Sequence, residues 1–121
     1  MKTNKFLIVL CALMLILPSC KLKKIVSVNY YYPPTSGVIP IYQTGQNLPE
    51  NIIRIGSIVV GESGLTPVKD CTYEVCIRTI EEEARKSGAD FIYLVSVKEP
   101  DWRGSLCYNI TAEFYKYTNN Q

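Results

Sequence analysis

The strongest constraint on the fold of this chain is a single amphipathic helical repeat with strand-forming segments on both sides of it. Its apolar positions recur every three or four residues and are Tyr73, Cys76 or Ile77, Ile80 and Ala84. Such spacing lines one face of a helix. Asp70 or Thr72 can cap its start, and Gly88 can end it in the left-handed conformation that glycine favours. Because the helix has one apolar face, the rest of the chain must supply the layer that buries it.

Four apolar segments are predicted to form that layer. They are residues 39–42 and 52–61 before the helix, and residues 91–97 and 106–115 after it. The last segment alternates apolar with polar side chains, which is typical of a strand covered on one face. The simplest arrangement is an α+β fold in which one helix packs on a sheet of about four strands, in the order β-β-α-β-β. Ile25, Val26 and Val28 are able to add a further short strand.

The beginning of the chain has the order of an export signal. Lys2 and Lys5 are followed by an apolar run from Phe6 to Leu17 and then by Pro18-Ser19-Cys20. The run is shorter than the roughly 20 residues of a membrane-spanning helix, so residues 1–19 are predicted to be a cleaved signal peptide. The end of this leader resembles the site at which lipoprotein signal peptidase cuts, which predicts lipidation of Cys20. The alternative is an ordinary secreted protein in which Cys20 pairs with another cysteine.

The mature chain divides by composition into a tether, a domain and a tail. Residues 20–37 are predicted as a lipidated tether, because three tyrosines are followed there by Pro-Pro-Thr-Ser-Gly, and a proline pair favours an extended chain. Residues 38–118 are the predicted domain and residues 119–121 the tail. Aromatic side chains often anchor interfaces, which makes the three tyrosines candidates for contact with a partner or a membrane. They are Tyr30, Tyr31 and Tyr32. Packing of these rings on the domain is the alternative.

The net charge of the mature chain bears on its partners, and the residue after the predicted lipidated cysteine bears on its location. Removal of Lys2 and Lys5 with the leader leaves as many basic as acidic residues. A chain without net charge gives no reason to expect nucleic-acid binding. Residue 21 is Lys, whereas lipoproteins resembling those of enteric bacteria are retained in the inner membrane by Asp at that position. We therefore expect a lipid-anchored outer-membrane protein whose partners are the bilayer and another envelope protein.

Five cysteines are present, and Cys11 and Cys20 belong to the leader and the lipidation site. The other three, Cys71, Cys76 and Cys107, would lie in a compartment that permits disulfides. A bridge between Cys71 and Cys107 is favoured, because it ties the start of the helix to the last strand and leaves Cys76 as a free thiol on the apolar stripe. Pairing of Cys76 with Cys107 is the alternative. A bridge between Cys71 and Cys76 is disfavoured, because a helix that begins between them holds their side chains apart.

The residue types that most often carry chemistry are scarce. The chain contains no histidine, which is the commonest general base and a member of most nucleophile triads. Residues 61–64, Gly-Glu-Ser-Gly, lack the lysine that follows in a phosphate-binding loop of the Walker type. Zinc usually takes four ligands from Cys, His or carboxylates, which three irregularly spaced thiols do not favour. We therefore expect no catalytic residues, no metal site and no cofactor.

Three stretches of the sequence together resemble a known family. They are IGSIVVGESGLT, the helix and following strand TYEVCIRTIEEEARKSGADFIYLVSVKEP, and SLCYNITAEFYKY. With Cys71 directly before the helix, they are similar to small outer-membrane lipoproteins of the Rcs envelope-stress sensor type and to lipoproteins of the Bacteroidota. More distantly, they resemble heavy-metal-binding-like domains of the YbjQ type. The resemblance covers residues 39–117.

The resemblance implies a helix on a small sheet, bridged by Cys71 and Cys107, that works by protein contact and signals through an inner-membrane partner. Two features depart from the sensor family: the tether is short, and three thiols allow one disulfide where the sensors have two. The first functional prediction is a membrane-anchored, non-enzymatic interaction domain with a role in envelope-stress sensing. The alternatives are a periplasmic metal or small-ligand binder of YbjQ type and a structural envelope lipoprotein.

Overall fold

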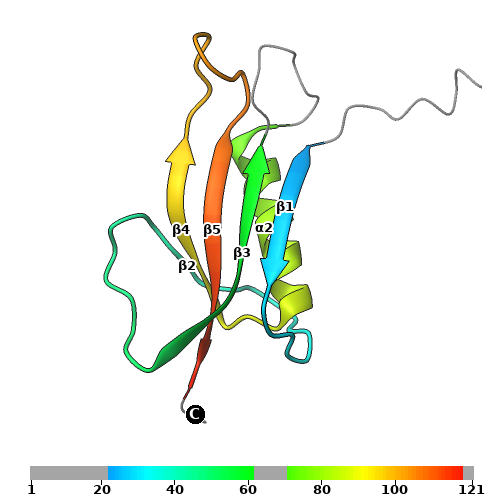
Figure 1. The fold of residues 1–121 in the computed structure, drawn as a ribbon, viewed down its shortest axis with the longest axis vertical. Coiled ribbons are helices and arrows are strands. Elements are labelled where there is room, and N and C mark those ends of the chain that lie inside the picture. The colour runs from blue at the N-terminus through cyan, green and yellow to red at the C-terminus, as the bar shows by residue number, and fades with distance from the viewer. Residues whose placement is uncertain (1–21, 62–70, 119–121) are drawn as a thin grey trace, which may run out of the picture.

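In the part of the chain that the structure describes, one helix packs on one face of a five-stranded sheet, which confirms the α+β class (Figure 1). The computed structural model describes residues 22–61 and 71–118. The elements in chain order are β1 (Lys23–Val28), β2 (Ile41–Tyr42), β3 (Ile52–Gly61), α2 (Tyr73–Ser87), β4 (Phe91–Lys98) and β5 (Asn109–Tyr117). The predicted signal peptide of residues 1–19, the lipidation site Cys20, the alternative cap Asp70 and the tail of residues 119–121 lie outside the described residues.

The strand order across the sheet is β1-β3-β5-β4-β2. All neighbouring strands are antiparallel except β2 and β4, which pair in parallel through Ile41 with Ile92 and Tyr42 with Tyr93. The predicted strand over residues 52–61 is confirmed. The predicted strand over 91–97 is also confirmed and extends one residue further, to Lys98. The three inner strands, β3, β5 and β4, each have a hydrogen-bonded neighbour on each side.

The sheet has one strand more than the predicted order β-β-α-β-β, and this additional strand, β1, forms where Ile25, Val26 and Val28 were able to add one. β1 lies within residues 20–37, the stretch predicted as a tether, and pairs with β3 along its whole length, from Lys23 with Gly61 to Val28 with Gly56. The physical reason is that Val26 and Val28 pack against the core while the backbone of β1 satisfies the free edge of β3. The sheet therefore begins at Lys23 and not at residue 38.

The last strand begins later than the predicted start at residue 106. Leu106 precedes the strand and is 42% exposed, whereas Cys107 is buried. A disulfide joins Cys107 to Cys71, which confirms the favoured pairing. This bond holds the chain against the start of the helix, so regular pairing with β3 and β4 starts only at the following residues.

The core lies between α2 and the sheet face toward it. The helix contributes the predicted stripe, of which Cys76, Ile80 and Ala84 are fully buried. The sheet contributes side chains that alternate along its strands, as expected for a strand covered on one face. These residues are Ile58, Val60, Ile92, Leu94, Ile110, Ala112 and Phe114. Both predicted ends of the helix are confirmed, since Thr72 accepts a hydrogen bond from the Val75 amide and Gly88 has φ of 78°.

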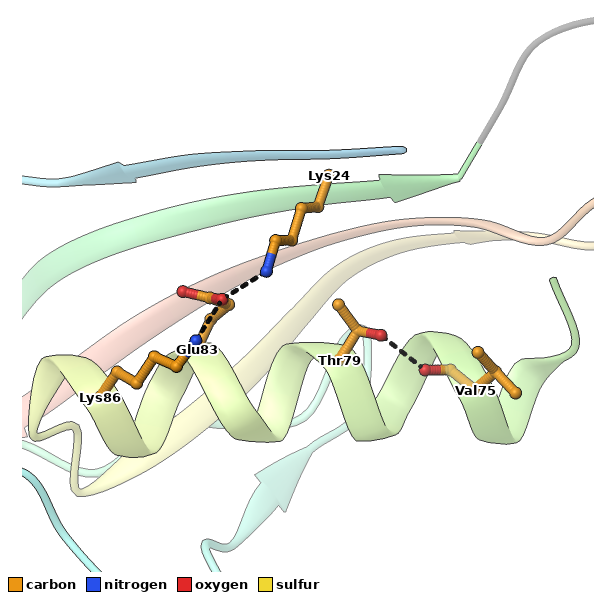
Figure 2. Close-up of polar contacts among 5 residues, drawn as sticks. All are labelled: Lys24, Val75, Thr79, Glu83 and Lys86. Atoms are coloured by element: carbon orange, nitrogen blue, oxygen red, sulfur yellow. Dashed lines mark hydrogen bonds and ion pairs between the residues drawn. The ribbon is translucent and has the colours of Figure 1, made fainter. Parts of the chain in front are cut away.

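An ion pair fastens β1 to the helix. Lys24 Nζ lies 2.7 Å from Glu83 Oε1, and Lys86 Nζ shares the same oxygen at 3.3 Å (Figure 2). The Glu83 side chain is only 13% exposed. Figure 2 also shows Thr79, whose hydroxyl donates to the Val75 carbonyl at 2.9 Å one turn earlier on the helix. The hydrogen bond from Lys24 holds the pKa of the Glu83 carboxyl below its ordinary value.

This depressed pKa predicts a pH-dependent contribution of Glu83 to stability. A carboxyl whose pKa is lowered by folding stabilises the folded state above its unfolded pKa, about 4.3, and loses that contribution as the pH falls through the folded value. Urea midpoints of the wild type and Glu83→Gln should therefore differ at pH 7, and the difference should shrink as the pH falls from about 4.3 through the lower folded value. Glu82→Gln, on the exposed side of the same helix, is the control. A wild-type advantage that does not shrink as the pH is lowered below about 4.3 would contradict the role assigned to the ion pair.

Candidate functional site

The segment that carries the tyrosine triplet is fixed to the carboxyl end of the helix. The backbone amide of Tyr32 donates to the Ser87 carbonyl at 3.0 Å, and the amide of Thr35 donates to the Arg85 carbonyl at 3.0 Å. Carbonyls of the last helical turn have no partner within the helix. Residues 29–37, which we call the tyrosine segment, therefore supply hydrogen bonds that α2 cannot make for itself.

Side-chain and close backbone contacts hold the tyrosine segment further. Arg85 Nε donates to the Gly37 carbonyl at 2.9 Å, so one helical residue binds the segment through both its backbone and its side chain. At Gly88 a Cβ atom would come within 2.7 Å of Tyr32 Cβ and 2.6 Å of the Pro33 carbonyl oxygen. The positive φ and this close approach together require glycine there. The segment is thus an ordered part of the domain surface.

The three tyrosines have different environments. The ring of Tyr32 packs against the core, and Lys116 Nζ lies 5.1 Å from its centroid. Tyr30 and Tyr31 are 57% and 73% exposed. The start of the segment is held by Asn29, whose amide donates to the Ile55 carbonyl at 2.8 Å. Of the predicted contact residues, the structure therefore presents two, Tyr30 and Tyr31, and assigns the third to packing.

The tyrosine segment lies at the opposite end of the sheet from the start of β1. Val28, the last residue of β1, pairs with Gly56, whereas Lys23 at the start pairs with Gly61. Figure 1 shows β1 running from the end where a loop joins β4 to β5 toward the end where α2 finishes. The predicted lipid attachment site precedes the start of β1 in the chain, and the exposed tyrosines follow its end. The two are thus connected to opposite ends of one strand.

A second group of aromatic side chains lies on the sheet face that α2 does not cover. Phe91 pairs with Tyr115 while the next residue, Ile92, pairs with the core residue Phe114, so the first pair points away from the helix. Phe91 is nevertheless fully buried. Its ring centroid lies 4.9 Å from that of Tyr42, 5.2 Å from that of Tyr115 and 5.5 Å from that of Tyr117. Sequence reasoning missed this cluster, although apolar residues on both faces of the 91–97 segment were a signal for it.

The three cysteines of the domain take two roles. Cys71 and Cys107 form the disulfide, with their Cα atoms 5.1 Å apart. Cys76 is a free thiol that is fully buried, and its Sγ lies 4.0 Å from the Tyr108 carbonyl oxygen. Burial raises the pKa of the Cys76 thiol, which lowers its reactivity as a nucleophile. Pairing of Cys76 with Cys107, the alternative left open by the sequence, does not occur.

The described residues contain neither a cluster of metal ligands nor a membrane-spanning helix. No group of three or more His, Cys, Asp or Glu side chains within residues 22–61 and 71–118 is arranged to hold a metal ion. In the same part of the chain, no helix has both the length and the apolar character that a membrane crossing needs.

Comparison with known proteins finds no match: no protein-family model, no curated protein and no solved structure is similar to the chain. The resemblance to envelope-stress sensor lipoproteins therefore stays a prediction.

Removal of the disulfide should destabilise the domain markedly. The bridge joins residues 36 apart in sequence, and chain-entropy models give roughly 2–4 kcal/mol for such a link. We expect Cys71→Ala combined with Cys107→Ala to lower the free energy of unfolding by about that amount in urea titrations. A thiol reductant should lower the urea midpoint of the wild type and of Cys76→Ala, but not that of the double variant. A reductant-sensitive double variant would contradict the assigned pairing.

Substitution at Gly88 tests whether the tyrosine segment is fixed to the helix. Gly88→Ala combines a left-handed residue with a collision against Tyr32 and Pro33, so we expect a loss of more than about 2 kcal/mol in free energy of unfolding. Gly45→Ala is the matched control, because Gly45 also has a positive φ, 84°, but open space around it. That variant should lose only about 1 kcal/mol in the same urea titration. Equal losses would contradict the close approach at Gly88.

Proposed function

We propose that the chain is an outer-membrane lipoprotein, anchored through acylated Cys20, whose domain recognises another envelope protein and has no catalytic role. The observation that carries the proposal is the presence of two exposed tyrosines, Tyr30 and Tyr31, on a backbone segment fixed to the end of α2. Envelope-stress sensing is the finer role that we propose, and it rests on the resemblance of the sequence to sensor lipoproteins.

Exposed tyrosines on ordered backbone suit recognition of a protein. A tyrosine side chain offers a large contact area and a hydroxyl group with only two rotatable side-chain bonds, so little conformational freedom is lost on binding. The hydrogen bonds from Tyr32 and Thr35 to the helix order the backbone before a partner arrives. Ordering in the free protein removes part of the entropy cost of association.

The position of β1 supports contact on the side of the domain away from the membrane. Lys23 begins β1 only three residues after Cys20, and each residue spans at most about 3.6 Å. A lipid on Cys20 would therefore hold the start of β1 within about 11 Å of the attachment point. The six residues of β1 carry the chain about 20 Å further, to the tyrosine segment. If β1 points away from the bilayer, recognition at Tyr30 and Tyr31 takes place beyond the headgroup region.

Crosslinking in the intact envelope tests this proposal. A photo-reactive phenylalanine analogue at position 31 should give a discrete crosslinked protein, whereas the same analogue at position 38 should give none. Val38 is the matched control because it is 94% exposed and follows directly on the tyrosine segment. We expect Tyr30→Ala to reduce the yield at position 31 by at least several-fold, through loss of an interface aromatic. Equal yields from positions 31 and 38, or a yield unaffected by Tyr30→Ala, would contradict recognition by the tyrosines.

The anchor is tested separately by intact mass spectrometry of the protein purified from membranes. The expected mass is that of residues 20–121 with acyl chains on Cys20, and Cys20→Ala should abolish both the cleavage and the lipid. A mature protein without acyl chains would contradict the anchor while leaving the crosslinking result to stand on its own.

A further inference from the structure

The loop between β4 and β5, residues 99–108, exposes large apolar side chains on ordered backbone. Trp102 is 72% exposed and Leu106 is 42% exposed. The backbone beneath them is closed by hydrogen bonds from the Asp101 amide to the Ser105 carbonyl at 2.7 Å and from the Gly104 amide to the Asp101 carbonyl at 3.0 Å. An exposed indole held on an ordered turn presents a fixed apolar surface to whatever lies beyond the loop.

The strand register places this loop at the end of the sheet where β1 begins. Lys23 pairs with Gly61, and the neighbouring Val60 pairs with Ile110. On the other side of β5, Lys98 pairs with Asn109. The start of β1, the end of β3, the start of β5 and the end of β4 therefore share one end of the sheet, and Figure 1 shows the β4–β5 loop extending beyond it. The chain leads from this same end toward Cys20.

The chemistry of the loop suits the boundary of a lipid bilayer. Tryptophan is enriched at membrane interfaces, where the ring lies among the headgroups and its N–H meets water or phosphate. The guanidinium of Arg103 lies 5.0 Å from the centroid of the Trp102 ring, an arrangement in which ring and cation attract one another. Arg103 and Lys98 are both exposed, as are the acidic Glu99 and Asp101 between them, so the phosphate contact depends on Arg103 itself, which can pair with phosphate oxygens in two places at once, and not on a net positive charge. An indole beside an arginine thus offers both an apolar group and a phosphate-binding group.

We propose that the Trp102 loop is a second membrane contact, with the indole among the headgroups of the leaflet that holds the lipid of Cys20. This inference rests on the anchor in the proposed function. The occupant is the bilayer and not a protein, because about 11 Å of chain at most separates Cys20 from β1 and leaves no space for a folded partner between this end of the sheet and the membrane. Two contacts at one end make the sheet stand on the bilayer, and Tyr30 and Tyr31 then face away from it.

The chain has a single tryptophan, so its fluorescence reports on this loop alone. The lipidated protein purified from membranes, with its acylated mass verified, is reconstituted into vesicles of phosphatidylethanolamine and phosphatidylglycerol. Phospholipids brominated near the top of the acyl chain should quench Trp102 at least twofold, and aqueous iodide should quench it several-fold less than it quenches free tryptophan. Full access to iodide together with no quenching by brominated lipid would overturn the inference.

A relocated indole provides the matched control. Trp102→Phe combined with Tyr31→Trp moves the only indole to the opposite end of β1, where iodide should quench it fully and brominated lipid should not. Equal quenching by brominated lipid at both positions would show a sheet that lies flat, and would overturn the proposal. Failure of the anchor is seen separately, as a mass without acyl chains, whereas failure of the loop contact is seen as an unquenched Trp102 in protein whose mass includes them.

Discussion

The pairing of β1 with β3 is the interaction on which the rest of the structure depends. β1 forms one edge of the sheet. Its pairing with β3 runs from Lys23 opposite Gly61 to Val28 opposite Gly56. Val26 and Val28 add to the core, and Lys24 binds Glu83 of the helix, so β1 is held by backbone, apolar and charged contacts at once. Because β1 leads directly into the tyrosine segment, the position of that segment is set by this pairing.

The end of α2 shows how the need to satisfy backbone groups can shape a surface. The last carbonyls of a helix must find donors outside it, and here the amides of Tyr32 and Thr35 provide two of them. Gly88 leaves space for the approach. As a result, a stretch rich in proline and tyrosine, whose composition is usual in linkers, packs along the end of the helix in one conformation. Tyr32 packs inward, and its two neighbours in sequence stay accessible.

Local patterns were enough to predict the helix with Thr72 as one of two candidate caps and its end at Gly88, and the strands over 52–61 and 91–97, and the expected order of these elements was enough to favour the disulfide. Long-range pairing was not predictable in the same way. Ile25, Val26 and Val28 made a short strand possible, but its place at the edge of the sheet, beside β3, could not be read from that segment. The parallel pairing of β2 with β4, and the rings that surround Phe91, join residues far apart in the chain. No periodicity within one segment encodes such contacts. The difference in burial between Tyr32 and its neighbours Tyr30 and Tyr31 likewise depends on where the helix ends.

The direct connection from Lys23 through β1 to Tyr30 has a mechanical consequence. A pull between the membrane and a protein bound at the tyrosines would act on the two ends of the same strand, and the covalent backbone of β1 would bear it. The hydrogen bonds to β3 run perpendicular to that direction, and because both forces act on β1 itself, these bonds would carry little of the load. Such an arrangement allows the domain to transmit force between its two ends while its core stays folded.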